Sequence, residues 1–276
     1  MKKTWFISGA SSGLGREMTR QLLARGDVVI GTARREGALT DLKQDHGDSL
    51  HVLKLELTDT ESIRAAIDKG FSLGTIDVVV SNAGYGLVGA AEELTDTQID
   101  QQIATNLVGS IQLIRAALPH LRAQGGGRIL QVSSEGGQIA YPNFSLYHAT
   151  KWGIEGFIEA VSQEVASFGI DFIIAEPGPT VTNFRNGCVV AEPMAVYGDT
   201  PAGDVRRAIS SGAFVLAGDA ARTAAAMIAA ADETIPALRL ALGSSAFNSI
   251  SKALGQRLAS VEGQREIAYS ADRSGV

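Results

Sequence analysis

Short apolar runs alternate along the chain with longer stretches of helical periodicity. Seven runs are nearly continuous in hydrophobicity and several are rich in β-branched residues, which is typical of strands covered on both faces of their sheet. They predict strands over 4–8, 28–33, 51–55, 78–81, 128–132, 171–175 and 238–242. Helices are predicted between them, for example over 15–25, 62–69, 103–122 and 146–167. Repeated strand–helix–strand units indicate an α/β fold with a doubly wound parallel sheet.

A single domain is expected over 1–276, because no linker and no internal repeat interrupts this alternation. The irregular segment is 177–218, which is rich in glycine, proline and small residues. A loop of this length in a compact domain is usually functional, and we expect its part around 183–216 to form a lid over a substrate. Alanine-rich residues 219–231 predict a further helix. Residues 260–276 lose apolar periodicity, so we expect a flexible tail there.

Composition narrows the class of protein. The hydrophobic fraction of 45% and the charged fraction of 20% are ordinary for a globular protein. A net charge of −6 favours solubility and gives no reason to expect a nucleic-acid partner. The one cysteine, Cys188, has no disulfide partner within the chain, and no Cys/His spacing indicates a metal site. The apolar start is too short for a signal peptide and no stretch is long enough to span a bilayer, so a cytoplasmic protein is expected.

A glycine-rich turn follows the first predicted strand and opens the first predicted helix. Gly9, Gly13 and Gly15 permit a tight turn, close approach of the backbone to a phosphate, and close packing of helix on strand. The helix presents free N–H groups and a positive dipole end to a pyrophosphate. A turn without a ligand is the alternative. The place of the turn favours dinucleotide binding on a Rossmann-type doubly wound parallel sheet, in a three-layer α/β/α architecture.

The end of the second predicted strand bears on the choice between NADP and NAD. Ala33 stands near the point where an NAD site usually carries an acidic residue for the ribose 2′-hydroxyl. Arg34 follows it and could pair with a 2′-phosphate through its planar fork, and Arg16 is a second cation close by. Glu36 is the rival signal for NAD, but it lies past the strand end. The residues therefore favour NADP(H), with NAD(H) as the alternative cofactor.

Tyr147 and Lys151 stand four residues apart in a predicted helix, so their side chains share one face. A tyrosine with an ordinary pKa of about 10 exchanges protons poorly at neutral pH, and a nearby ammonium group lowers that pKa. General acid–base catalysis requires such tuning. A strand that ends in Ser133 and Ser134 precedes the helix, and a hydroxyl at this edge of a sheet can hydrogen-bond a substrate oxygen. By spacing alone, a surface helix pair is the alternative for Tyr147 and Lys151.

In their order along the chain, these motifs resemble those of the classical short-chain dehydrogenases/reductases of the NADP-preferring type, from the first strand to about Leu242. Ser8 stands where the family's glycine motif has threonine, and the run 81–84 resembles its Asn-Asn-Ala-Gly motif. The resemblance implies the catalytic set Asn106, Ser134, Tyr147 and Lys151. The family's spacing of thirteen residues before the tyrosine selects Ser134 over Ser133, whose hydroxyl is expected to be structural.

The resemblance also implies a role for each member of this set. Tyr147 would be the general acid in reduction and the base in oxidation. Lys151 would lower its pKa and hold the nicotinamide ribose. Ser134 would orient the carbonyl oxygen, and Asn106 would support a water-linked proton relay, a helix kink or cap being the alternative reading of Asn106.

The residues expected at the cofactor come from the turns that follow the predicted strands and from the catalytic helix. They are Gly9, Ser11, Ser12, Gly13, Leu14, Gly15, Arg16, Arg34, Glu56, Leu57, Asn82, Ala83, Gly84, Tyr147, Lys151, Pro177, Gly178, Thr180 and Thr182. Glu56 stands where the family usually has the shorter aspartate, and we expect Glu56 still to reach the adenine amino group.

The implied function is that of an NADP(H)-dependent oxidoreductase that interconverts a ketone or aldehyde and an alcohol by hydride transfer. The loops beyond the strand ends are largely apolar or aromatic, which suits a hydrophobic small molecule. Substrate contacts are expected from Glu135, Tyr141, Phe144, Phe184, Met194 and Tyr197, with Tyr85, Leu87 and Val189 as further candidates.

Two other functions stay open on the sequence alone. The first is a non-catalytic NADP-binding regulator on the same fold. The second is a 3-oxoacyl-carrier reductase, although the overall acidity offers no basic docking surface. Members of the family often pair the helices that correspond to 103–122 and 146–167, so the resemblance implies a homodimer or homotetramer.

Overall fold

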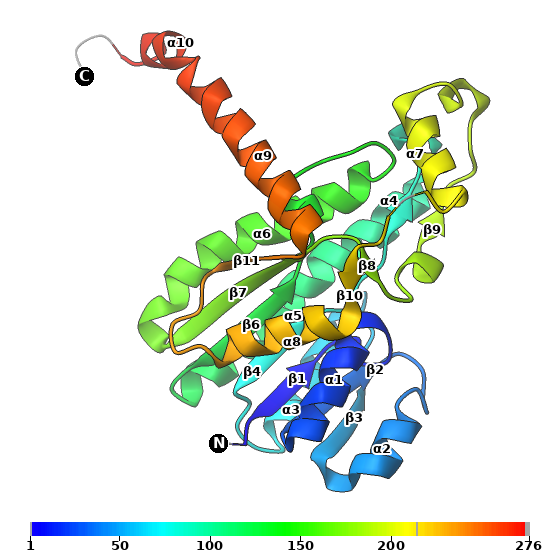
Figure 1. Cartoon of the computed structure of the whole chain (residues 1–276). Helices are drawn as coiled ribbons and strands as arrows, with labels where there is room; N and C mark the ends of the chain where they lie inside the picture. The colour runs from blue at the N-terminus through cyan, green and yellow to red at the C-terminus, as the bar shows by residue number, and fades with distance from the viewer. Residues whose placement is uncertain (1, 214, 274–276) are drawn as a thin grey trace.

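The computed structural model describes residues 2–213 and 215–273, and seven parallel strands form its central sheet in the order β11-β7-β6-β4-β1-β2-β3 (Figure 1). The strands are β1 Thr4–Ile7, β2 Val28–Ala33, β3 Leu50–Lys54, β4 Val78–Ser81, β6 Gly127–Val132, β7 Ile170–Pro177 and β11 Arg239–Leu242. Every neighbouring pair is parallel. The predicted doubly wound parallel sheet is confirmed, with strand ends shifted by no more than two residues.

Helices connect these strands. They are α1 Gly13–Arg25, α2 Thr40–His46, α3 Thr60–Phe71, α4 Asp96–Ile103, α5 Gly109–Ala123, α6 Ser145–Val165, α7 Pro201–Ser210, α8 Ala220–Asp232, α9 Ser244–Glu262 and α10 Arg265–Ser270. Two-residue strands are β5 Leu87–Val88, β8 Thr180–Val181, β9 Val189–Val190 and β10 Gly218–Asp219. Single helical turns are η1 Gly47–Ser49, η2 Ala91–Glu93, η3 Ala104–Val108, η4 Glu135–Gly137, η5 Ala166–Phe168, η6 Arg185–Gly187 and η7 Ala195–Tyr197.

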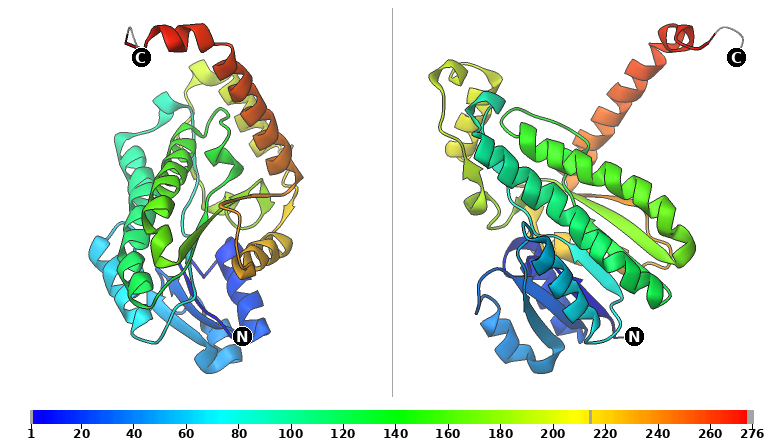
Figure 2. Two further views of the ribbon diagram at one scale, coloured as in Figure 1. Left: turned by 90° about the vertical axis from the view of Figure 1, so that its left-hand side faces the viewer. Right: turned by 180° about the vertical axis from the view of Figure 1, so that it is seen from behind.

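Helices cover both faces of the sheet, as the views in Figure 2 show. On one face the core includes Met18 and Leu22 of α1 and Met227 of α8. On the other face it includes Leu113 of α5 and Ile158 of α6, together with residues of α3. The near-continuous hydrophobicity of the strands follows from this double coverage, because each strand points apolar side chains into both cores. The predicted three-layer α/β/α arrangement is confirmed.

The strand order reverses between β1 and β4, because β2 and β3 follow β1 on one side while the later strands are added on the other. In an open α/β sheet, ligands bind outside the carboxyl ends of the strands at such a point. The turns after β1, β4, β6 and β7 all leave this edge. The fold therefore gathers the glycine turn, the 81–84 turn and the Ser133–Ser134 strand end in one region.

The continuous helix predicted over 103–122 is wrong at its start. Helix α4 ends at Ile103, the π-helical turn η3 covers Ala104–Val108, and α5 begins at Gly109. The amide of Asn106 bonds the backbone of Tyr85 outside the helix, which accounts for the irregular turn. Apolar periodicity records which face of a helix is buried and does not reveal such a polar contact.

The segment 183–216 holds η6, β9, η7 and α7, and its residue 214 lies outside the described residues. Strand β9 pairs with β5, so this segment is fixed to the chain between β4 and α4. The helix predicted over 219–231 is confirmed as α8.

Helices α9 and α10 extend away from the body of the molecule (Figure 1). The chain is helical through Ser270, although apolar periodicity is lost beyond residue 259, and residues 274–276 of the expected tail lie outside the described residues. Leu258 and Ile267 are 60% and 74% exposed, so no core imposes a periodic pattern here. The flexibility expected of this tail stays a prediction.

Candidate active site

The turn after β1 is shaped by glycine. Gly9 has a left-handed φ of 70°, and a Cβ placed on it would come within 2.9 Å of the Cβ of Ala83. A Cβ placed on Gly15 would lie 2.4 Å from the carbonyl oxygen of Gly9. No larger residue fits at Gly15 without a shift of the backbone, since the clash is with a main-chain atom. These two glycines let the turn, helix α1 and the neighbouring 81–84 turn approach closely.

The third glycine faces open space. Gly13 begins α1 with a φ of 54°, and a Cβ placed on it would meet, among the described atoms, only the Cβ of Thr182 at 3.9 Å. Ser12 precedes the helix, and its side chain makes no capping hydrogen bond. The first N–H groups of α1 therefore keep their hydrogen-bonding capacity for a ligand. An open helix N-terminus beside a glycine fits the pyrophosphate of a dinucleotide, with Thr182 on the far side of the gap.

The 81–84 turn is tied to the glycine turn by hydrogen bonds. The Asn82 side-chain amide donates to the carbonyl oxygens of Ser8 and Gly9, at 2.9 and 3.2 Å. The backbone N–H groups of Asn82 and Ala83 donate to the Ser8 Oγ, at 2.9 and 3.1 Å. The serine that replaces the family's threonine thus supplies the acceptor that joins the two turns.

Asn106 lies beside this turn. Its Oδ1 accepts from the backbone N–H of Tyr85 at 3.1 Å, and its Nδ2 donates to the Tyr85 carbonyl oxygen at 2.8 Å. A Cβ placed on Gly84 would lie 3.1 Å from the same Oδ1. Asn106 therefore holds the chain that leaves the 81–84 turn. It also lies in the π-helical turn η3, so the helix kink that was the alternative to a role in a proton relay is present as well.

Tyr147 and Lys151 lie on one face of α6, both buried, with the Lys151 Nζ 5.6 Å from the centre of the tyrosine ring. Ser134 follows β6 and caps η4, where its Oγ accepts from the backbone N–H of Gly136 at 3.1 Å. Lys151 donates from Nζ to the carbonyl oxygen of Val132, at the end of the same strand, at 2.9 Å. The strand end and the helix face thus meet, as the predicted constellation requires.

The pKa values of this pair are set mainly by burial. Burial raises the pKa of Tyr147 to about 12, and only the hydrogen bond with Ser134 opposes it. Burial lowers the pKa of Lys151 to about 8, while the charge of Glu155 acts in the opposite direction. The expectation that Lys151 lowers the Tyr147 pKa is not met in the protein alone, because desolvation of the phenolate dominates.

Behind helix α6 lies a group of carboxylates, of which Glu155 and Glu176 are buried. The Ser133 hydroxyl donates to Glu155, a contact in keeping with the structural role expected of it. Arg239 of β11 pairs with Glu155 and Glu159 of α6 and with Glu176 of β7. One guanidinium therefore joins α6 to two strands directly behind the site.

The residues expected near the adenosine part of the nucleotide are Arg34 at the end of β2, Arg16 in α1 and Glu56 after β3. Arg34 is exposed. Arg16 forms an ion pair with Asp41 of α2. The hydrogen bond from Arg16 lowers the pKa of the Asp41 carboxyl. Glu56 accepts from the N–H and the hydroxyl of Thr58 and so stabilises its own turn.

The other residues expected at the cofactor lie along the carboxyl edge of the sheet. Ser11 lies in the turn after β1 and Leu14 in the first turn of α1, both half-buried, and Leu57 is buried after β3. Pro177 ends β7 beside Leu242, and the backbone N–H of Gly178 donates to the Leu242 carbonyl oxygen.

Four of the six expected substrate residues surround Tyr147. The rings of Phe144 and Phe184 lie 6.3 and 5.9 Å from the Tyr147 ring, and the Tyr141 ring lies 5.2 Å from that of Phe144. Glu135 directly follows Ser134, and its charge contributes to the raised pKa of Tyr147.

Met194 and Tyr197 make their polar contacts elsewhere. The backbone N–H of Met194 donates to Glu93, and the Tyr197 hydroxyl donates to Glu92. Of the further candidates, Leu87 is buried in a small cluster, and Val189 pairs with it across β5 and β9. The structure thus separates Met194 and Tyr197, by their contacts, from the aromatic group around Tyr147.

Sequence reasoning missed two residues that shape this region. Ser249 of α9 donates a 3.0 Å hydrogen bond to Glu135, from beyond the end of the family resemblance. Glu93 is buried and pairs with Arg206 of α7. Burial alone would raise the Glu93 pKa, but the N–H groups of Met194 and Ala90 and the Arg206 guanidinium bring it below its ordinary value. Neither residue carried a usable signal in the sequence, because the contact of Glu93 with Arg206 and that of Ser249 with Glu135 each join segments more than 100 residues apart.

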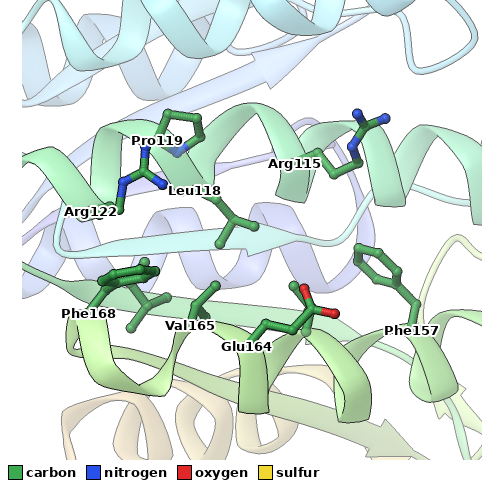
Figure 3. Close-up of a pocket in the computed structure, with 10 residues that line it drawn as sticks. Arg115, Leu118, Pro119, Arg122, Phe157, Glu164, Val165 and Phe168 are labelled. Carbon is green, nitrogen blue, oxygen red and sulfur yellow. The ribbon is translucent and has the colours of Figure 1, made fainter.

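A shallow hollow lies between α5 and α6, away from the site (Figure 3). Leu118, Phe157 and Val165 contribute apolar surface, while Arg122 and Glu164 face it from opposite helices. In residues 2–213 and 215–273, no helix combines the length and the hydropathy needed to cross a bilayer. The same residues contain no group of three or more His, Cys, Asp or Glu side chains that could hold a metal ion.

Comparison with known proteins places these features in a family. A sequence model of that family, described as short chain dehydrogenase, matches residues 3–191. The chain is 36% identical to oxidoreductase BOA17 of Botryotinia fuckeliana over 98% of this chain and 99% of that protein. It is 33% identical to 3-ketodihydrosphingosine reductase of Bacteroides thetaiotaomicron over 67% of each. The crystal structure of a short-chain dehydrogenase from Streptomyces avermitilis superimposes with a TM-score of 0.91, 36% identity and 98% coverage of both chains.

Proposed function

The chain belongs to the short-chain dehydrogenase family and is an oxidoreductase acting on CH–OH groups, and from this premise we propose that it uses NADP(H) to interconvert a ketone or aldehyde and the corresponding alcohol. The observation that carries the proposal is the meeting of Ser134, Tyr147 and Lys151 at the same edge of the sheet as an open helix N-terminus. A largely hydrophobic small molecule fits the aromatic side chains around Tyr147.

The cofactor would be held by the turns at the carboxyl edge of the sheet. The N–H groups of the turn at Gly13 would bind its pyrophosphate, with Thr182 across the gap. Asn82 keeps that turn close to the 81–84 turn, along which the dinucleotide would lie. Lys151 would hold the nicotinamide ribose. When bound, the nicotinamide supplies the hydride in reduction and accepts it in oxidation.

The chain's own residues would then manage the proton and the developing charge. Tyr147 would donate its phenolic proton to the carbonyl oxygen in reduction and take the proton back in oxidation. Ser134 would donate a hydrogen bond to the same oxygen as charge builds on it. Lys151, whose pKa burial lowers to about 8, would still be mostly protonated at neutral pH. Its charge would favour the phenolate left on Tyr147 during the reaction, although burial outweighs it in the protein alone.

Asn106 acts on the backbone in this proposal. Both of its amide atoms bond Tyr85, which holds the 81–84 turn against η3. A π-helical turn in a helix is frequently found at a functional site. The role of Asn106 in a water-linked proton relay is consistent with this placement and forms part of the proposal.

NADP(H) is favoured over NAD(H) by the charge at the end of β2. Arg34 is exposed where the adenosine ribose would lie, and its guanidinium suits a 2′-phosphate. Arg16 would join it by leaving Asp41, an exchange that costs little because an exposed ion pair contributes at most about 1 kcal/mol. Glu56, which holds its own turn through Thr58, is proposed to meet the adenine amino group.

The segment 183–216 is proposed to act as the substrate lid. Phe184 contacts Tyr147 at one end of it, while Glu93 fixes Met194 and Arg206 farther along. The mobile part would therefore be the chain around η6. Limited proteolysis should show protection of this part when NADPH and a carbonyl substrate are added together, and equal cleavage with and without them would refute the lid.

The proposal is tested with NADPH that carries deuterium at the transferable position and a panel of aryl and alkyl ketones and aldehydes. We expect NADPH to be consumed and the deuterium to appear on the carbinol carbon of the product. Binding of NADPH without turnover of any carbonyl would favour the regulator. Turnover of 3-oxoacyl groups only when they are joined to a carrier protein would favour the 3-oxoacyl-carrier reductase.

A further inference from the structure

A buried carboxylate directly follows the proposed catalytic serine. Glu135 is the residue after Ser134 and begins η4, and it is only 6% exposed. Successive Cα atoms lie about 3.8 Å apart, so Glu135 starts beside the group proposed to bind the carbonyl oxygen. Charged side chains are rarely buried without a partner that compensates for lost hydration.

The partners of Glu135 leave half of its carboxylate without a hydrogen bond. Ser249 of α9 donates to its Oε2 at 3.0 Å. Within residues 2–213 and 215–273, no other donor bonds the carboxylate and no cation pairs with it. Burial raises the Glu135 pKa, and the Ser249 hydroxyl opposes this only in part. Oε1 is therefore free to accept a hydrogen bond from a bound molecule.

The carboxylate lies at the edge of the sheet where the turn after β7 passes. A Cβ placed on Gly178, in the turn after β7, would lie 3.4 Å from Oε2. The charge of Glu135 also contributes to the raised pKa values of both Tyr141 and Tyr147. Glu135 thus lies between the turn after β7 and helix α9, and its charge acts on the two tyrosines of the proposed substrate site.

The chemistry of this group decides what it would accept. An anionic substituent would be repelled by the carboxylate, and an alkyl group would leave Oε1 buried without a donor. A hydroxyl group can donate to the ionised carboxylate and can accept from the protonated one, so it suits a carboxyl group whose pKa is raised. The aromatic rings of Phe144 and Phe184 remain available for an apolar body.

We propose that Glu135 selects carbonyl substrates that carry a hydroxyl group on the carbon next to the carbonyl. The inference rests on the proposed function, because Ser134 and Tyr147 must hold the carbonyl oxygen for Glu135 to meet its neighbour. The substrate class is then that of α-hydroxy ketones and aldehydes, and of the vicinal diols that form from them.

Two ketones of equal size test this selection. 2-Hydroxyacetophenone and propiophenone differ only in a terminal hydroxyl in place of a methyl group. We expect the wild-type kcat/KM with NADPH to favour the hydroxyketone by about tenfold or more, the effect of one hydrogen bond to a charged group. Glu135→Leu should bring the ratio close to one. Glu135→Gln should leave an intermediate preference, because an amide oxygen accepts a weaker hydrogen bond than a carboxylate does.

The ratio is measured within one preparation of each variant, so partial misfolding cancels. If Glu135→Leu fails to fold, Glu135→Gln decides the matter, since an unchanged ratio in that variant would overturn the selection. Ser249→Ala is the matched control: it removes the contact with α9 and should retain the preference. A wild-type protein that reduces both ketones equally would refute the role of Glu135 alone. A wild-type protein that binds NADPH and reduces no carbonyl would refute the proposed function itself.

Discussion

At the scale of single residues, the choice of nucleotide depends on one exposed guanidinium. Arg34 lies at the end of β2, and Arg35 beside it is exposed as well. Arg34→Ala should lower kcat/KM for NADPH by roughly 10- to 100-fold, the effect of losing a charge-assisted contact with the 2′-phosphate. The value for NADH should change by less than about threefold, because NADH lacks that phosphate.

Steady-state kinetics with both nucleotides measure this difference. Arg35→Ala is the matched control and should leave the ratio of the two values unchanged. An equal loss with NADPH and NADH in Arg34→Ala would show that Arg34 supports the fold or the adenine region and does not choose the nucleotide.

Single residues also show what the sequence could and could not reveal about the site. Gly9, Gly15 and Tyr147 were readable because their roles depend on local spacing after a strand or along one helix turn. Ser249 was not readable, since its contact with Glu135 spans 114 residues and depends on how α9 crosses η4. The raised pKa of Tyr147 in the protein alone was not readable, because a sequence shows the neighbouring lysine but not the burial that outweighs it.

At the scale of elements, strands were predicted better than helix ends. Each of the seven strands contributes to a doubly covered sheet, so its apolar run records its position. The π-helical turn η3 was missed because the side chain of its Asn106 bonds Tyr85, which lies outside the helix, and the apolar pattern does not show such a bond. The helical course beyond residue 259 was also missed, because α9 and α10 have largely exposed side chains and no core to impose a pattern.

Arg239 links β11 electrostatically to helix α6. Arg239→Leu would leave Glu155 and Glu176 buried without their cation. We expect a loss of about 3–5 kcal/mol in the free energy of unfolding, which is typical of a buried pair that loses one partner. Urea denaturation measures this loss, and Arg239→Lys is the control that keeps the charge and should lose less. A loss below about 1 kcal/mol in Arg239→Leu would mean that the cluster behaves as a surface ion pair.

The same cluster predicts how stability depends on pH. Burial and the neighbouring Glu155 raise the pKa of Glu176 to about 7 from an ordinary value of 4.5. A group with a raised folded-state pKa stabilises the fold fully below its unfolded pKa and loses that contribution as the pH rises through the folded value. The free energy of unfolding of the wild type should therefore fall as the pH rises from 4.5 to 7. This fall should be larger than that of Glu176→Gln by on the order of 2 kcal/mol. Parallel curves for the two proteins would exclude Glu176 as the titrating group.

At the scale of the whole molecule, the face formed by α5 and α6 is proposed to pair two copies of the chain, as the family resemblance implies. Its hollow is lined by Leu118 and Phe157 among others, and Arg122 and Glu164 offer opposite charges on the two helices (Figure 3). Phe157→Glu should convert a dimer to monomers, or a tetramer to dimers, because it buries an unpaired charge at the contact.

Sedimentation velocity of the wild type and the variant measures the change in mass. Ile267→Glu is the control, since Ile267 lies on the projecting α10 and is 74% exposed. A variant Phe157→Glu with an unchanged oligomeric mass would place the contact elsewhere, and a monomeric wild type would refute the assembly.

The central claim is that Tyr147 exchanges the proton that accompanies hydride transfer. The most direct measurement is the rate of NADPH oxidation with a carbonyl substrate in wild type and Tyr147→Phe, with NADPH binding followed by fluorescence in both. Tyr147→Phe should bind NADPH within about threefold of wild type and lose roughly 100- to 10,000-fold in kcat, the usual contribution of a positioned acid. If Tyr147→Phe turned the substrate over at the wild-type rate, the proton would come from another group and the proposed mechanism would be wrong.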